Sequence, residues 1–244
     1  MKTKQRQQGF TLVEMAVTMG VVSLLGVAVM TFYLQSLNMG YASQQQISLI
    51  GTMRSFTSEL IYSASRAHEM ILYPTASAAD RNEVSDRRDI VSNEDGSETR
   101  PTGNLAVFVY YELPKPATQA RHRINRIIAY FPEQTDSGPP RLTRLTIDLR
   151  AAPSTLPVEE LLTTYWSASG GGVQVSRKTF APRVAPLALS DSFNPDTDEP
   201  QLFYKRSAAN LAVCGQLFES NSRADTKDQR TYTRTFFFTV TTRS

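Results

Sequence analysis

The sequence predicts an α+β protein in which a long N-terminal helix packs on a mostly antiparallel β-sheet. Three observations lead to this prediction. Residues 10–34 form an apolar run of 25 residues with a single charge, Glu14. All 13 prolines lie at Pro74 or later. From Asn104 onward, short segments rich in β-branched and aromatic residues alternate with turn residues, as in a chain of strands.

The apolar run is long enough to cross a membrane. At about 1.5 Å per residue, a helix over residues 10–34 spans roughly 37 Å, which exceeds the thickness of a hydrocarbon core. Lys2, Lys4 and Arg6 precede it, and the next charge after Glu14 is Arg54. Because basic residues keep their end of a first transmembrane helix in the cytoplasm, we expect the rest of the chain on the far side.

The helix is expected to continue beyond the membrane. Proline in a helix interior costs about 3 kcal/mol, so its absence before Pro74 predicts one helix from Phe10 to about Tyr73. Residues 35–73 would be its amphipathic half, because apolar residues recur there at three- and four-residue steps. These residues are Ile47, Ile50, Met53, Leu60, Ala64, Ala67 and Ile71.

The remainder of the chain divides by composition. Residues 74–103 are dense in charge and contain no aromatic residue, which predicts a long exposed loop. Residues 104–244 are expected to form a β-rich headgroup outside the cytoplasm. The segments with strand-like composition are 105–113, 124–131, 141–150, 161–166, 173–180, 202–205, 211–219 and 232–241.

Charge and cysteine content limit the functions and the covalent bonds that the chain can have. The net charge is +3, and three of the basic residues lie before the apolar run. Without them 23 basic side chains face 23 acidic ones, so the basic balance is no argument for binding nucleic acid. Cys214 is the only cysteine, so no disulfide can form within the chain.

The residues at 9–14 are Gly-Phe-Thr-Leu-Val-Glu, between a basic tract and the apolar run. This arrangement resembles the processing and anchoring segment of type IV pilins and type II secretion pseudopilins, over residues 4–34. The resemblance implies a pilin-like fold and removal of a cytoplasmic leader, residues 1–9. A prepilin peptidase would cut between Gly9 and Phe10 and methylate Phe10.

The resemblance also implies an assembly role for Glu14, which in this family pairs with the N-terminal amine of the adjacent subunit. The implied partners are prepilin peptidase, other pilin or pseudopilin subunits, the inner-membrane assembly platform and membrane lipid. Many major pilins close a loop with a disulfide that this chain cannot form, which favours a minor pilin or pseudopilin. It would span the bacterial inner membrane once, with a periplasmic or extracellular headgroup, and enter a pilus or pseudopilus on assembly. The choice between type IV pilus and type II secretion stays open.

Two binding hypotheses come from the headgroup. Arg121, Arg123 and Arg126 could contact DNA phosphates, as in a DNA-uptake pilin, although such a cluster is more often a solvated strand end. Calcium is the one cofactor that the sequence suggests, because calcium takes oxygen ligands and one loop gathers several of them. These ligands are Asp191, Asn194, Asp196 and Asp198, in a loop without the glycine and spacing of an EF-hand.

We expect no catalytic residues. A membrane-anchored enzyme outside the cytoplasm could pair His122 with Cys214, but the apolar residues around Cys214 predict a buried cysteine in a strand. The chain has no Gly-x-Ser-x-Gly, no His-Glu-x-x-His and no phosphate-binding glycine loop. The sequence therefore favours a structural subunit.

Overall fold

A computed structural model describes residues 11–92, 98–99, 101–112, 122–135, 138–167, 172–186, 201–220 and 231–242. The chain divides into two compact units, Met1–Ile47 and Ser48–Ser244. Helix α1, Leu12–Arg66, contributes its first part to one unit and its last part to the other.

In the first unit, α1 presents apolar side chains on all sides. Residues 12–41 are exposed throughout. Within the described part of the chain, α1 is the one helix whose length and composition would let it cross a membrane. The predicted apolar helix is therefore present, and its side chains require a lipid or protein environment.

The end of α1 differs from the prediction. The helix ends at Arg66, and the expected continuation to about Tyr73 is wrong, because Glu69–Tyr73 form strand β1. Strand β1 pairs antiparallel with β5, Leu105–Tyr111. All of β1 after Glu69 is buried, with side chains on both faces of the sheet. The lack of proline permits a helix here but does not exclude a strand, and pairing with β5 selects the strand.

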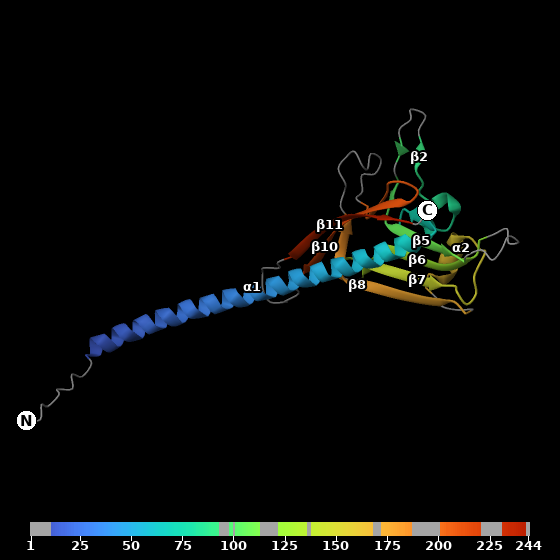
Figure 1. Ribbon diagram of the computed structural model, residues 1–244. Coiled ribbons are helices and arrows are strands. Elements are labelled where there is room, and N and C mark those ends of the chain that lie inside the picture. Colours follow the sequence, from blue (N-terminus) through green and yellow to red (C-terminus); the bar gives the residue numbers. More distant parts are fainter. Residues whose placement is uncertain are drawn as a thin grey trace, which may run out of the picture. The chain divides into compact units, whose positions relative to one another are not determined.

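The second unit contains a nine-stranded sheet in which all named pairs are antiparallel (Figure 1). The strand order is β1-β5-β6-β7-β8-β10-β9-β4, with β11 beside β10. Strands β8 and β9 share one edge of β10, which pairs with β9 through Leu211–Val213 and with β8 through Gly215–Phe218. The remaining bounds are β4 Thr102–Gly103, β6 Ile124–Thr135, β7 Gly138–Asp148, β8 Gln174–Pro186, β9 Phe203–Lys205, β10 Asn210–Ser220 and β11 Thr231–Thr241.

One face of the sheet packs against the last part of α1. Phe56 lies at the centre of this contact, with its ring 5.6–6.1 Å from the rings of four aromatic residues on three strands. Leu60, Ala64 and Ala67 are buried as the sequence predicts, but Ile47 is 66% exposed. The face of α1 that packs on the sheet is therefore rotated from the predicted face. Its largest side chain, Phe56, is not among the residues of the predicted face. The four rings are those of Tyr130, Phe180, Phe236 and Phe238.

The other face of the sheet is covered by a second helix, α2, Val158–Tyr165. The strand predicted at residues 161–166 is therefore wrong. Pro157 precedes the helix and two glutamates occupy its first turn, both of which favour a helix start. Val158, Leu161 and Leu162 share one face of α2 and are buried against β5, β6 and β7.

The segment 74–103 is more ordered than an exposed loop. It contains two short 3₁₀ helices, η1 Ala78–Asp80 and η2 Val84–Asp86, and a two-stranded sheet of β2 Val91–Ser92 and β3 Glu98–Thr99. Its last two residues form β4 in the large sheet. Arg81 is only 4% exposed. Its guanidinium lies 3.9 Å from the ring centroid of Trp166 and donates to the backbone carbonyl of Ala76. Composition alone could not anticipate this burial, because Trp166 is distant in the chain.

Candidate functional site

The start of α1 is organised by a reciprocal pair of side chains. The Glu14 carboxylate (Oε2) accepts hydrogen bonds from the backbone N–H of Thr11 at 3.0 Å and from the Thr11 hydroxyl at 3.1 Å. The backbone N–H of Glu14 donates to Thr11 Oγ1 at 3.3 Å. This is a capping box, which satisfies N–H groups that a helix leaves unpaired at its start.

Within the described residues, the capping box gives Glu14 hydrogen bonds but no cation. Both donors come from Thr11 and are neutral, so they satisfy the oxygen without cancelling its charge. A lone carboxylate is costly inside a membrane, and a cation beside it would remove much of that cost. The site can therefore receive an ammonium group. Gly9 and Phe10, the predicted cleavage and methylation residues, lie outside the described residues.

Three other hydroxyl side chains in the apolar stretch form hydrogen bonds within the helix. Thr18, Ser23 and Thr31 each donate a hydroxyl hydrogen bond to the backbone carbonyl four residues earlier, at 2.6–2.8 Å. Bonds of this kind let hydroxyl groups lie in a lipid environment without an external partner. Glu14 is thus the charged exception in a segment otherwise compatible with hydrocarbon.

A family model describing the prokaryotic N-terminal methylation motif matches residues 4–30. This motif is the prepilin-type signal of type IV pilins and pseudopilins, and the chain carries it. Comparisons with curated proteins and with solved structures give no match. The motif and the apolar helix together indicate a processed, pilin-like structural subunit, rather than an enzyme, anchored in a membrane by one N-terminal span. The match ends before the sheet unit begins.

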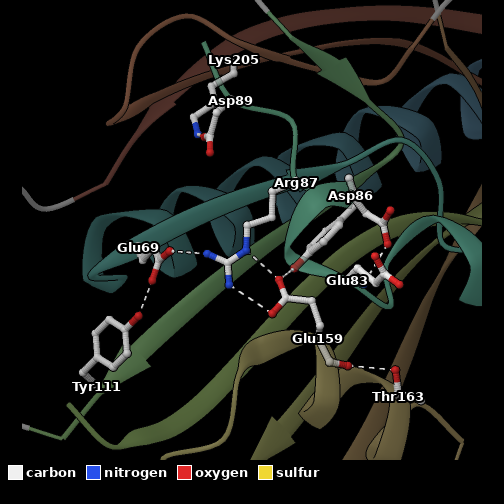
Figure 2. A network of polar contacts seen from close by, with 10 residues as sticks. Glu69, Glu83, Asp86, Arg87, Asp89, Tyr111, Glu159, Thr163 and Lys205 are labelled. Carbon is white, nitrogen blue, oxygen red and sulfur yellow. Dashed lines mark hydrogen bonds and ion pairs between the residues drawn. The ribbon is translucent and has the colours of Figure 1, made fainter. Parts of the chain in front are cut away.

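In the sheet unit, Arg87 lies at the centre of a network of polar side chains (Figure 2). Its guanidinium donates to both oxygens of Glu159, at 2.6 and 3.1 Å, and to Glu69 at 3.3 Å. Tyr73 donates to Glu159 at 2.6 Å, and Tyr111 donates to Glu69. One side chain of the segment 74–103 therefore binds β1 and α2 directly, and β5 joins this network through Tyr111 and Glu69.

The charge states of this network follow from its geometry. Burial opposes ionisation of Glu159, but hydrogen bonds from Arg87 and Tyr73 outweigh it and lower the pKa of the carboxyl group. Burial, with the bond to Glu159, raises the pKa of the Tyr73 hydroxyl. The pKa of Arg87 is raised mainly by its hydrogen bonds to Glu159. At neutral pH the network is an ion pair between a partly exposed Arg87 and a buried Glu159, with a neutral Tyr73, and it stabilises the fold without offering a reactive group.

The predicted DNA contacts are only partly described. Arg121 lies outside the described residues. Arg123 is exposed just before β6, whereas Arg126 lies within β6, 3.8 Å from Asp148 and with its guanidinium over the ring of Tyr110. Arg126 therefore faces the α1 side of the sheet, and DNA binding stays a prediction.

The calcium hypothesis also stays a prediction. Asp191, Asn194, Asp196 and Asp198 all lie outside the described residues. Within the ranges that the structure does describe, no group of three or more His, Cys, Asp or Glu side chains could hold a metal ion.

The cysteine–histidine pair is not assembled. Cys214 is buried in β10, as predicted, beside Tyr204 and Ala212, and burial raises the pKa of its thiol. The His122 ring instead lies against Tyr111, just before β6, and β7 and β8 separate β6 from β10. A thiol with a raised pKa and no imidazole beside it is a poor nucleophile.

Proposed function

We propose that the chain is a minor pilin or pseudopilin that joins a helical filament through α1. Prepilin peptidase would remove residues 1–9 and methylate Phe10, and the inner-membrane assembly platform would insert the subunit into a type IV pilus or type II secretion pseudopilus. Before assembly, the N-terminus would be cytoplasmic and the sheet unit periplasmic.

The observation that carries this proposal is the continuity of signal, span and scaffold in one helix. The match to the methylation motif includes the start of α1 and most of its exposed apolar stretch, and the end of the same helix is buried in the sheet unit. A simple signal peptide or membrane anchor does not need its helix to continue into a folded domain. A filament subunit does need this, because the helix that packs in the filament also holds the headgroup.

Glu14 would hold the N-terminal amine of the adjacent subunit. Each charge is costly alone in a nonpolar environment, and the pair neutralises both. The amine becomes available only after cleavage, so pairing would restrict assembly to processed chains. The capping box would keep the carboxylate in place on the first turn until the amine arrives.

Substitution of Glu14 can separate its charge from its capping role. Glu14→Gln removes the charge, but glutamine also serves at this position of a capping box. Thr11→Val removes the cap and keeps the carboxylate. We expect Glu14→Gln to be cleaved normally yet to enter filaments poorly, at about a tenth of the normal level or less, and Thr11→Val to assemble. Cleavage is measured by mass spectrometry and incorporation by quantifying the subunit in sheared filaments.

A Gly9→Leu variant is the matched control for processing, since it should keep the full leader and remain in the membrane. Normal incorporation of Glu14→Gln, or equal defects in Glu14→Gln and Thr11→Val, would contradict the pairing role. The expected outcome is mature Glu14→Gln, without the leader, that stays mainly in the membrane.

A further inference from the structure

A groove of about 570 Å³ lies in the sheet unit, beside the last part of α1. Two adjacent strands form its floor, where Ile128 of β6 lies directly opposite Thr146 of β7. Arg126 and Arg144 flank this pair from opposite ends, four residues apart along the strands, or about 13 Å. The wall formed by α1 consists of Ser58, Glu59, Tyr62 and Ser63.

The groove has more hydrogen-bond donors than acceptors. Arg126 Nε, Arg144 Nε and Thr146 Oγ1 are buried without a hydrogen-bond partner in the part of the chain that the structure describes. The Glu59 carboxylate offers two oxygens, and both are already occupied, one by Arg144 at 2.7 Å and the other by Lys178. Buried polar groups are almost always paired, so three unpaired ones in a single groove point to a ligand that supplies acceptors.

The charges around the groove point to the same kind of ligand. Asp148 is shared between Arg150, at 2.5 Å, and the more distant Arg126. The guanidinium of Arg66 lies 4.1 Å from the ring centroid of Tyr62 on the groove wall. Among the described residues that line the groove or pair with its lining, four cationic side chains outnumber two carboxylates, Glu59 and Asp148. The cations are Arg66, Arg126, Arg144 and Lys178.

We propose that this groove binds an oxyanion, a carboxylate or phosphate group. Such a group has only acceptors, which the unpaired arginine and threonine donors require, and its charge offsets the local excess of cations. The two arginines at opposite ends favour an extended ligand with more than one anionic group. The site does not depend on filament assembly.

Two ligand sources share this chemistry, an acidic peptide segment and a free inorganic anion. Isothermal titration calorimetry on the full chain in nonionic detergent would distinguish them, with hexaglutamate and inorganic phosphate as probes at low ionic strength. Hexalysine is the control for nonspecific association. Binding of hexaglutamate that weakens as salt is added is the expected result, since exposed charges are screened.

Two substitutions test whether the groove is the site. We expect Arg126→Gln to weaken binding about 10-fold, because charge-assisted bonds are the strong ones. Thr146→Val keeps the side-chain shape and should weaken binding about 3-fold while leaving the chain folded. Arg54→Gln removes an exposed arginine of α1 outside the groove and should leave affinity unchanged.

The calorimetry distinguishes a peptide ligand from a free anion and from the absence of a site. Tighter binding of hexaglutamate than of phosphate, lost in Arg126→Gln but not in Arg54→Gln, supports a peptide ligand. Binding of phosphate alone with the same dependence on Arg126 supports a site for a free anion. No binding of either probe, or equal weakening by all three substitutions, would overturn the proposal.

Discussion

Single residues carry much of the organisation of this chain. Phe56 joins α1 to the sheet through four aromatic rings, and Arg87 joins the charged segment to β1 and α2. The sequence pointed to Glu14 because a lone charge in an apolar run is conspicuous. It gave no such signal for Phe56 or Arg87, since their importance comes from residues far away in the chain.

Replacing Phe56 by alanine should loosen the contact between α1 and the sheet. The side chain is 1% exposed, and truncation of such a residue costs about 3–5 kcal/mol of unfolding free energy. Urea unfolding of the full chain in nonionic detergent, followed by fluorescence of Trp166, the only tryptophan, measures the loss. Ile61→Ala on the exposed side of α1 is the control and should change stability by less than about 1 kcal/mol. Equal losses would contradict the role of Phe56.

Because of the Arg87–Glu159 pair, the free energy of unfolding should decrease at low pH. The pKa of Glu159 is lowered by folding, so its contribution is full above the unfolded value of about 4.3 and is lost as pH falls through the folded pKa. Glu159→Gln should cost about 2 kcal/mol at pH 7, less than for a fully buried pair because Arg87 is partly exposed and keeps Glu69.

The same unfolding experiment at pH 7 and at about pH 3.5 tests this prediction. The stability of Glu159→Gln should fall less between the two pH values than that of the unaltered chain, because one linked proton has been removed. The exposed neighbour provides the control, since Glu160→Gln should keep the normal acid dependence. A steeper pH dependence in Glu159→Gln would contradict the sign of the effect.

At the scale of elements, prediction succeeded where local composition and burial agree. The apolar start of α1 and most strands after Asn104 lie where sequence patterns place them, because alternation and β-branched content reflect a half-buried surface. It failed at residues 69–73 and 161–166, short apolar runs that suit helix or strand equally well. Their tertiary partners, β5 and the far face of the sheet, decide between the two.

The candidate sites show the same division. Glu14 was found from its position in the motif, and its partner Thr11 lies in that motif too. The groove at Arg126 and Arg144 was not predicted, although Arg126 had been singled out for DNA. Its residues come from α1, β6 and β7, and only the register of those strands brings them together.

Two glycines should respond oppositely to alanine. A Cβ added at Gly103 in β4 would lie 2.2 Å from the backbone carbonyl oxygen of Tyr73, so β4 would have to move, at a cost of about 1–3 kcal/mol. A Cβ at Gly51 in α1 meets nothing within 4 Å, and alanine there should stabilise the helix by up to about 1 kcal/mol. Unfolding midpoints of the two variants measure both effects, and a destabilised Gly51→Ala would show that this helix face is in contact with a neighbour.

At the scale of the whole molecule, one helix contains the apolar stretch that anchors the chain in a membrane and the residues that pack on the sheet. The position of the basic residues before α1 predicts that the sheet unit lies outside the cytoplasm. The buried thiol of Cys214 makes this orientation easy to test, since a new exposed cysteine would be the reactive one.

Ser65→Cys places such a thiol on the exposed side of α1 within the sheet unit. In intact spheroplasts, we expect a membrane-impermeant maleimide to label Ser65→Cys and to leave the unaltered chain unlabelled. Denatured unaltered chain should react at Cys214, which controls for the reagent. Labelling of Ser65→Cys only after the membrane is permeabilised would place the sheet unit in the cytoplasm.

The sequence by itself determined the prepilin-type signal, the membrane-spanning stretch, the charge that marks it and the α+β class. These are properties of contiguous residues, so hydropathy and spacing are sufficient to detect them. Only the tertiary structure decided where α1 ends, that residues 158–165 form a helix and which arginines share a groove. Those outcomes depend on free energies of burial and pairing between residues distant in the chain, which local patterns do not contain.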